Sequence, residues 1–428
     1  MSRIREYLTV IACLGSVLSS GNLVAQGVLL PAGGAVNRGM GGATTGAAID
    51  PIGSMYWNPA TINQFDGDQV GFGFELIYGD QSLSSAFPGA GAGSTDADTG
   101  AVPVPTISWV HHTDNPNVTI GLGIFGIGGF AINLPADPSN PILSPPQALG
   151  GVGVGGIKSD AQFFGLAPAL SVRLTERLSV AAGPIVGLGR VMIDENPFAG
   201  LNGNGRYPRG DGTRFHWGLG AQFGIHYVHN CCWEFGANVK TPVWFEDFEY
   251  FSEDAVGLPR TDTLDIDLPL IVSSGFAYRG LDYIVFAADV RYLGYGSADG
   301  LGDPATYSAD GSANGLGWKD QFAMGLGAEL QLTERFVGRV GYTYSSELFD
   351  DQDTFFNVAS DLSYRHIPTA GASFRCSEKT VISAAYNYVA KWDSAGPYVL
   401  PGVGTVPGTS VSTDFAAHIL TVGLNVSY

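Results

Sequence analysis

Histidine and acidic side chains are the residues of this 428-residue chain that could bind a metal ion or transfer a proton. The chain has seven histidines, and none stands at the spacing of a zinc site. The stretch "ELFDDQDTFF" brings four carboxylates together. They belong to Glu347, Asp350, Asp351 and Asp353. It lacks the glycine and the terminal glutamate of a calcium loop, and runs of like charge are usually solvated. We therefore expect a solvated loop and no metal site, with cation bridging to lipopolysaccharide phosphates as the alternative that the sequence leaves open.

Nucleophilic and cofactor motifs give the same answer. No "GxSxG" elbow is present, and "GLGIFGIGG" is read as a strand rich in glycine, since no helix and acidic ribose partner follow it. Beyond the first residues the cysteines are Cys231, Cys232 and Cys376, an odd number without a CxxC spacing. The sequence predicts no catalytic residue, no cofactor and no enzyme.

Composition limits the fold. Apolar residues make up 45% of the chain, charged residues only 14%, and 61 residues are glycine. After the first 25 residues no apolar run reaches the ~18 residues of a membrane helix. A soluble β-protein or a membrane β-barrel is left, and a net charge of −19 argues against nucleic-acid binding.

The N-terminus has the pattern of an export signal. Arg3 and Arg5 precede the apolar "YLTVIACLGSVL", and "NLVAQ" offers a small-residue cleavage site near Ala25. A second interpretation, a lipoprotein signal ending at Cys13, has only a short apolar stretch before the cysteine. We expect residues 1–25 to be removed on export.

Strict alternation predicts strands with one apolar face. In the C-terminal "HILTVGLNVSY", Leu420, Val422 and Leu424 alternate with small or polar residues. The same period recurs in "QFAMGLGAELQL", "FFGLAPALSVRL" and "FVGRVGYTYS". A membrane strand needs about 9–11 such residues, apolar toward lipid and small or polar toward the lumen.

The connections favour a barrel over a sandwich. Six short turns, among them two copies of "LTER", alternate with seven long loops rich in Gly, Pro, Ser, Asp and Asn. The long loops are expected over 79–101, 128–160, 193–213, 251–262, 296–317, 346–360 and 392–411. Short turns at one end and long loops at the other are typical of a membrane barrel. We predict an all-β fold, an antiparallel transmembrane β-barrel of about fourteen strands over residues 66–428.

The segment before the first strand, residues 26–65, shows no such alternation. It is rich in Gly and Ala and ends in "SMYWNPATINQF". A lumen of about fourteen strands is too wide for its own side chains to fill, so we predict that this segment lies inside the barrel as a plug. Pro59 biases Asn58 toward an extended conformation, and the Asn58 amide can then bind free backbone groups. Tyr56, Trp57 and Phe65 supply apolar area.

This order resembles the FadL/TodX family of outer-membrane transporters for long-chain fatty acids and other hydrophobic compounds. The resemblance rests on a Gly/Ala-rich start, an Asp, "NPA", and then the first strand, and it extends over the mature chain. It implies that residues 26–65 form a hatch held in part by Asn58, Pro59 and Ala60. It also implies an outer-membrane location and passive uptake of hydrophobic molecules.

The resemblance further implies an exit through the wall. In the family the third strand is kinked and leaves a lateral opening for apolar ligands. Here that strand is "VTIGLGIFGIGGFAINLP", and glycines mark bends in strands. We expect the opening at Phe125, Gly126, Gly128, Gly129 and Phe130. The family's proline before the bend is missing here.

Other functions stay open at this stage. A general porin or a structural or adhesive barrel is the alternative, but an open porin has no use for a plug. A barrel phospholipase would need an "HxSNG"-like stretch, which this sequence lacks. The expected partners are a hydrophobic small-molecule ligand, outer-membrane lipid and lipopolysaccharide, and the barrel assembly machinery. We expect a monomer.

Overall fold

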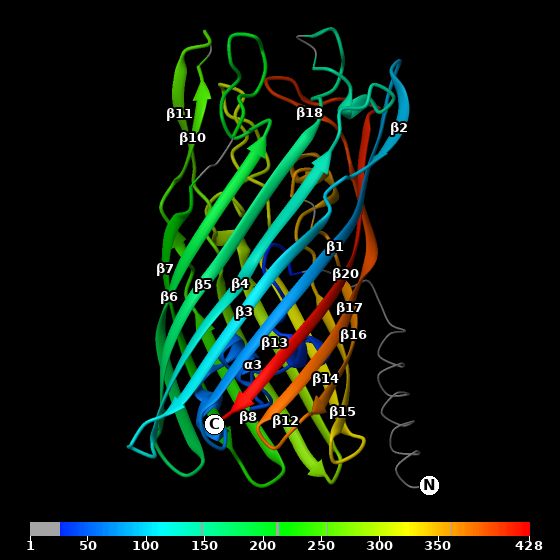
Figure 1. Ribbon diagram of the computed structural model, residues 1–428. Helices are drawn as coiled ribbons and strands as arrows, with labels where there is room; N and C mark the ends of the chain where they lie inside the picture. The colour runs from blue at the N-terminus through cyan, green and yellow to red at the C-terminus, as the bar shows by residue number, and fades with distance from the viewer. Residues whose placement is uncertain (1–25, 147–148, 211–213, 255, 361) are drawn as a thin grey trace.

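Fourteen antiparallel strands close into a barrel in the part of the chain that the structure describes (Figure 1). A computed structural model describes residues 26–146, 149–210, 214–254, 256–360 and 362–428. Each barrel strand pairs with the next along the chain, and β1 (Gln69–Phe87) pairs with β20 (Ser410–Ser427) to close the ring. The predicted barrel of about fourteen strands is confirmed. The predicted export signal, residues 1–25, lies outside the described residues.

The other barrel strands follow in chain order. They are β3 (Ala101–His112), β4 (Val118–Leu134), β5 (Ile157–Arg173), β6 (Leu178–Asp194), β7 (His216–Val228), β8 (Trp233–Lys240), β12 (Leu270–Leu281), β13 (Ile284–Gly294), β14 (Gln321–Gln331), β15 (Phe336–Ser345), β16 (His366–Arg375) and β17 (Thr380–Gly396). Short strands and 3-10 helices lie in the long connections. They are β2 (Gly91–Asp96), η2 (Pro141–Leu143), β9 (Trp244–Phe245), β10 (Phe248–Glu253), β11 (Pro259–Leu264), η4 (Tyr295–Ser297), η5 (Asp351–Asn357), β18 (Val399–Leu400) and β19 (Gly404–Thr405).

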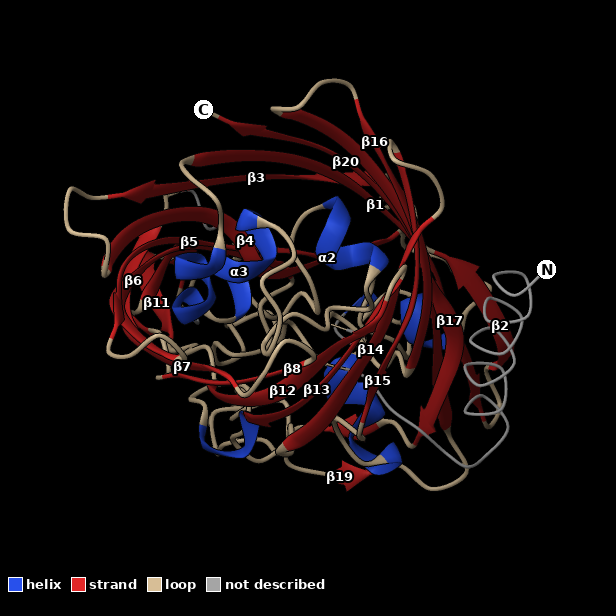
Figure 2. Cartoon of the chain, turned by 90° about the horizontal axis from the view of Figure 1, so that it is seen from below, coloured by secondary structure: helices blue, strands red, loops and turns tan. Residues whose placement is uncertain are grey.

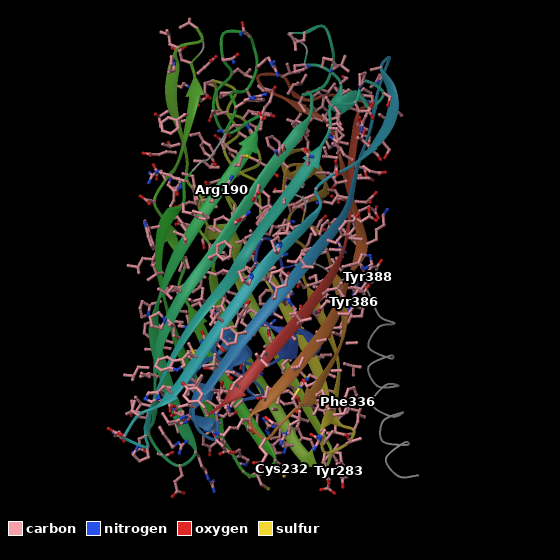
Figure 3. The ribbon with its side chains drawn as sticks, viewed as in Figure 1. Arg190, Cys232, Tyr283, Phe336, Tyr386 and Tyr388 are labelled. Carbon is pink, nitrogen blue, oxygen red and sulfur yellow. The ribbon has the colours of Figure 1, made fainter. Side chains whose placement is uncertain are left out.

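The alternation of the sequence places an apolar band on the outside of the barrel. Phe72, Phe74 and Leu76 of β1 are exposed, whereas Glu75 between them is buried. Exposed aromatic side chains lie at different heights on the outer wall. Tyr283 and Phe336 are near the short turns and Tyr386 is higher on the wall (Figure 3). Such aromatic residues are typical of the two lipid–water interfaces of a membrane barrel.

The strands are longer than the sequence predicted. Residues 79–87, expected in a loop, continue β1 and pair with β20 and β2. Residues 128–134 continue β4, and the fourth long connection is 241–269 rather than 251–262. Hydropathy marks only the part of a strand that faces lipid, but the backbone ladder continues above that band. The first two loops were predicted to begin too early for this reason, whereas the fourth was predicted too short because β8 already ends at Lys240.

Residues 26–64 lie inside the ring of strands. They include α2 (Ala35–Gly39), α3 (Pro51–Trp57) and the 3-10 helix η1 (Pro59–Gln64), which Figure 2 shows within the barrel. Nearly every residue from 26 to 63 is buried. Among the described residues, no helix has the length and hydropathy to cross a membrane. We call residues 26–65 the inner segment.

Candidate functional site

Asn58 joins two helices of the inner segment to each other and to the wall. It ends α3 and begins η1 with an extended backbone, as the following Pro59 favours. Its amide nitrogen donates to the carbonyl oxygens of Thr45, at 2.8 Å, and of Ile225 in β7, at 3.0 Å. Its amide oxygen accepts a bond from the Ala60 N–H at 3.1 Å. One buried side chain therefore connects three pieces of backbone.

Glycines of the wall make room for this contact. A Cβ on Gly224 of β7 would lie 2.2 Å from Asn58 Oδ1, and one on Gly236 of β8 would lie 2.0 Å from the Thr45 carbonyl oxygen. Farther round the barrel, a Cβ on Gly325 would lie 2.6 Å from the Gly41 carbonyl oxygen, and one on Gly341 would lie 2.4 Å from the Gly41 backbone nitrogen. Inward-facing glycines thus let the inner segment lie directly on the wall backbone.

Two buried ion pairs hold the first half of the inner segment. Arg38 of α2 pairs with Glu75 of β1 at 2.6 Å, and Glu75 also accepts the Gly34 N–H at 3.0 Å. On the far side Asp289 of β13 accepts the N–H groups of Thr44 and Thr45, each at 2.9 Å, and pairs with Arg291 at 3.1 Å. In the sequence, Glu75 and Asp289 stand at polar positions of alternating strands. The sequence does not show which groups these carboxylates bind.

The aromatic residues of the inner segment have different surroundings. The Trp57 ring contacts the Arg291 guanidinium at 3.7 Å and the Lys240 ammonium at 4.9 Å. The Tyr56 ring meets Phe125 of β4 edge to face at 5.2 Å, and its hydroxyl donates to the Leu30 carbonyl at 2.8 Å. Phe65 is only partly buried, at the end of η1. The structure brings Tyr56, but not Phe65, to the bend of β4.

The wall is unpaired on one side of that bend. The β3–β4 ladder runs from the pair His112/Thr119 to the pair Ile107/Ile124 and then ends. Beyond it β5 is the only barrel strand that pairs with β4, as far as Leu134, with a bulge between Gly126 and Gly128. The first residues of β3 pair with β1 on their other edge. A gap therefore separates β3 from β4 above Ile124, and it ends where the Asp98 N–H donates to the Asn133 carbonyl at 2.7 Å. We call it the wall gap.

The start of the inner segment covers part of this free edge. Leu29 forms an antiparallel bridge with Gly128. The Leu30 N–H donates to the Ile127 carbonyl at 2.9 Å, and the Gly129 N–H donates to the Val28 carbonyl at 3.0 Å. Residues 28–30 thus add a very short strand to β4 from within the lumen. The local sequence gave no signal of this contact.

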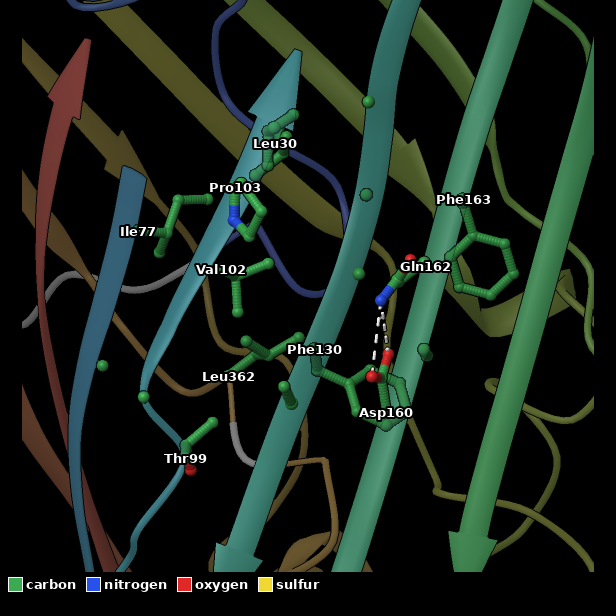
Figure 4. Close-up of a pocket in the computed structure, with 18 of the residues that line it drawn as sticks. Leu30, Ile77, Thr99, Val102, Pro103, Phe130, Asp160, Gln162, Phe163 and Leu362 are labelled. Atoms are coloured by element: carbon green, nitrogen blue, oxygen red, sulfur yellow. Dashed lines mark hydrogen bonds between the residues drawn. The ribbon is translucent and has the colours of Figure 1, made fainter. Parts of the chain in front are cut away.

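An apolar cavity of about 120 Å³ lies at the wall gap (Figure 4). Its lining includes residues from both faces of the wall. Ile77 and Phe415 belong to the inward face of their strands, and Gln162 and Phe164 to the outward face of β5. Phe130 also lines it, as do Gly126, Gly128 and Gly129. Four of the five residues assigned to the expected opening therefore line the cavity, while Phe125 is buried against Tyr56.

Gly128 makes room for the inner segment and does not leave open space in the wall. A Cβ there would lie 2.4 Å from the Val28 carbonyl oxygen, so the space above Gly128 already holds residues 28–30. A Cβ on Gly126 would instead approach Val104 of β3 across the gap. Of the two glycines, Gly126 is the one whose side chain would fill the gap.

Three carboxylates lie close together at a place that the sequence did not predict. Carboxylate oxygens of Asp265, Asp267 and Asp299 lie within 4.8 Å of one another, in the long connections. In the acidic stretch, Asp350 pairs with Lys319 and Glu347 with Arg365. Folding thus brings Asp299 close to two carboxylates that are distant from it in the sequence. In the acidic stretch, by contrast, two of the carboxylates form ion pairs with basic side chains.

The closed barrel, its apolar band and its filled lumen define an outer-membrane transport barrel. The chain belongs to the outer membrane protein transport protein family (OMPP1/FadL/TodX), whose model matches residues 16–428. The family is one of outer-membrane transporters of hydrophobic compounds.

Solved structures share the fold. The toluene transporter TodX of Pseudomonas putida has 15% identity and a TM-score of 0.70, over 93% of this chain and 99% of that one. The toluene transporter TbuX of Ralstonia pickettii has 16% identity and a TM-score of 0.65, over 93% and 99%. A Pseudomonas aeruginosa FadL homologue has 13% identity and a TM-score of 0.70, over 94% and 100%. No curated protein is significantly similar in sequence.

Proposed function

We propose that this protein admits long-chain fatty acids or hydrocarbons through a barrel closed by the inner segment, and releases them sideways into the membrane through the wall gap. The inner segment acts as the hatch, with Asn58, Pro59 and Ala60 holding its fixed part. The observation that carries the proposal is the end of the β3–β4 ladder at Ile107 and Ile124, beside an apolar cavity lined from both faces of the wall.

The energetics favour a lateral path for such substrates. Each CH₂ group gains about 0.8 kcal/mol on leaving water, so an aqueous exit is unfavourable for a long chain. The wall gap lies beside the apolar band, because Phe74 of β1 pairs with Pro105 of β3 and is exposed on the outside. A molecule leaving there meets lipid rather than water.

The fixed and movable parts of the hatch follow from their contacts. Residues 37–63 are held by the ion pair of Arg38, the two bonds to Asp289 and the three bonds of Asn58. Residues 28–30 have the short bridge to β4 and the hydroxyls of Tyr56 and Tyr295. We infer that residues 28–30 move during release while the rest of the hatch stays in place.

A disulfide across the wall gap tests the exit. A Cβ on Gly126 would lie 3.8 Å from the Val104 Cβ, which is the usual separation in a disulfide. The double variant Val104→Cys/Gly126→Cys is made in a background with serine at Cys231, Cys232 and Cys376. Uptake of a labelled hydrophobic substrate into cells is then measured before and after reduction.

We expect the oxidised double variant to lose most uptake and to regain it with a reductant, because the bond joins β3 to β4. Each single-cysteine variant, at the same level of folded barrel, serves as the control. Its uptake should change neither on oxidation nor on reduction. Uptake that is equal in the oxidised and reduced double variants, with the disulfide shown by mass spectrometry, would contradict a lateral exit.

A further inference from the structure

Gln26 is the first residue of the inner segment, and it lies in the lumen with no exposed surface. Neither its side-chain amide nitrogen nor its amide oxygen has a hydrogen-bond partner in the described protein, which is unfavourable for a buried amide. The adjoining backbone at Gly27 lies against buried side chains, since a Cβ there would lie 2.9 Å from the Tyr295 ring and 3.1 Å from Leu348. Neither the hatch contacts nor the wall gap accounts for a glutamine at this place.

Two tyrosine hydroxyls hold the start of the inner segment. Tyr295 Oη donates to the Gln26 carbonyl oxygen at 2.8 Å and accepts the Leu29 N–H at 3.2 Å. Tyr364 Oη donates to the Gly27 carbonyl oxygen at 3.3 Å. Both partners are neutral, and both bond to the backbone and not to the glutamine side chain.

A charged N-terminus does not suit these surroundings. The predicted removal of residues 1–25 on export makes Gln26 the first residue, with an α-amino group that is mostly protonated at neutral pH. Two carboxylates of the wall that bind the inner segment, those of Glu75 and Asp289, already pair with arginines. A buried ammonium without a carboxylate partner is strongly unfavourable.

We propose that Gln26 becomes the N-terminal residue on export and cyclises to pyroglutamate, which gives the inner segment a neutral N-terminus. The unprotonated α-amine attacks the side-chain carbonyl carbon Cδ, and the new N–Cδ bond closes a lactam ring. The Cδ–Nε2 bond breaks, and Nε2 leaves as ammonia with one proton from the amine. No oxidant or other reactant is consumed. The step removes the terminal charge together with the unpartnered Nε2, and it leaves the backbone carbonyl that Tyr295 binds unchanged.

A neutral N-terminus lets residues 26–30 stay packed in the lumen. These residues include Leu29, which forms the bridge to Gly128, and Leu30, whose N–H donates to the Ile127 carbonyl at 2.9 Å. A charged terminus would favour water over these surroundings, and the bridge at the free edge of β4 would open with it. The ring therefore holds the start of the hatch in its resting position. This inference goes beyond the proposed function and does not depend on a lateral exit.

Amine labelling of the exported protein tests the modification. The protein is purified from outer membranes, unfolded in denaturant, treated at once with an isotope-labelled amine-reactive reagent and then cut with trypsin. The N-terminal peptide, residues 26–38, contains no lysine, so label on it reports the α-amine alone. We expect this peptide without label and lighter by one ammonia. A synthetic peptide of the same sequence with a free N-terminal glutamine, carried through the same steps, should be labelled and thus show that the procedure does not itself close the ring.

Gln26→Met separates the terminal charge from the packing of the side chain. Methionine has a similar length and loses no hydrogen bond of the amide, but it cannot form the lactam. Its free α-amine should be labelled, and the Leu30 amide hydrogen should exchange about tenfold or more faster than in the wild type, because a buried ammonium is unfavourable. Gln222→Met is the matched control, since Gln222 is also buried with an unpartnered amide but lies inside β7 and cannot cyclise. It should leave the exchange of Leu30 unchanged.

The possible results are distinct. An unlabelled wild-type terminus together with faster exchange of Leu30 in Gln26→Met supports the inference. A labelled Gln26 in the wild type, or an exported chain that begins at another residue, would overturn it. Wild-type exchange in Gln26→Met, at a normal level of folded barrel, would overturn the holding role of the ring. None of these results bears on the lateral exit, which the disulfide across the wall gap tests by itself.

Discussion

Leu29 lies opposite Gly128 in an antiparallel bridge, so the start of the inner segment pairs with the strand edge that β3 leaves free. Two backbone hydrogen bonds flank this bridge. A strand edge without partners is costly in lipid, where no water can satisfy it. Residues 28–30 therefore satisfy part of the edge at the gap that we propose as the exit.

Gly128→Ala should release this bridge. The added Cβ would lie 2.4 Å from the Val28 carbonyl oxygen, which is backbone and cannot rotate away. We expect faster exchange of the Leu30 amide hydrogen, which bonds to Ile127, and faster uptake of hydrophobic substrates. Gly73→Ala on the inward face of β1 is the matched control, because its Cβ has neighbours no closer than 3.4 Å. Unchanged exchange of Leu30 in Gly128→Ala would show that the bridge does not depend on this glycine.

Asn58→Ala should loosen the fixed part of the inner segment without preventing assembly. The change removes two bonds that its amide nitrogen donates and one that its oxygen accepts, each worth about 0.5–1.5 kcal/mol. We expect faster hydrogen exchange in residues 44–60 and altered uptake at a normal level of folded barrel. Asn230→Ala, in an exposed short turn, is the control. Wild-type exchange in the Asn58 variant would rule out its holding role.

The strands of this fold could be predicted because lipid imposes a period of two on each of them. Leu420 and Val422 face outward at more than half exposure, as the alternation predicts. The count of short turns and long loops then gives the number of strands. The upper ends of the strands could not be predicted, because residues such as Ser84 and Ser85 pair in the ladder without facing lipid.

The site was predictable only where the signal is local. "NPA" fixes the backbone at Asn58, and the glycines mark the bend of β4. The bridge between Leu29 and Gly128 joins backbones that are distant in the sequence, so neither residue type indicates it. Glu75 and Asp289 stand at inward positions of their strands, but their partners depend on how the inner segment folds.

Asp289→Ala should destabilise the protein more than the double change Asp289→Ala/Arg291→Met. Removing Asp289 alone leaves Arg291 buried without its partner, which typically costs about 3–5 kcal/mol. The double variant removes the unpaired charge but still loses the acceptor for the Thr44 and Thr45 N–H groups, so recovery should be partial. Thermal unfolding in detergent measures the stability of both variants. Equal unfolding temperatures for the single and double variants would contradict this view of the pair.

The connections around Asp267 should be held more tightly in mild acid than at neutral pH. Burial, together with the negative charges of Asp265 and Asp299, raises the pKa of Asp267 from 3.8 to about 6, although a bond from the Phe245 N–H opposes the shift. The folded form therefore holds more protons than the unfolded form between these two values. Its stability falls as pH rises through that window and is level above it.

Limited proteolysis of the long connections in intact membranes, at about pH 5 and about pH 8, measures this difference. The wild type should be cut more slowly at the lower pH, after correction for the protease's own pH dependence. Asp267→Asn keeps an oxygen acceptor for Phe245 and cannot ionise, so it should lose most of the acid protection; burial also raises the pKa of the neighbouring Asp265, which can retain a part of it. In Asp310→Asn the acid protection should persist, because Asp310 has a pKa lowered by hydrogen bonds from Ser312. Equal cutting of the wild type at both pH values would show that Asp267 does not control these connections.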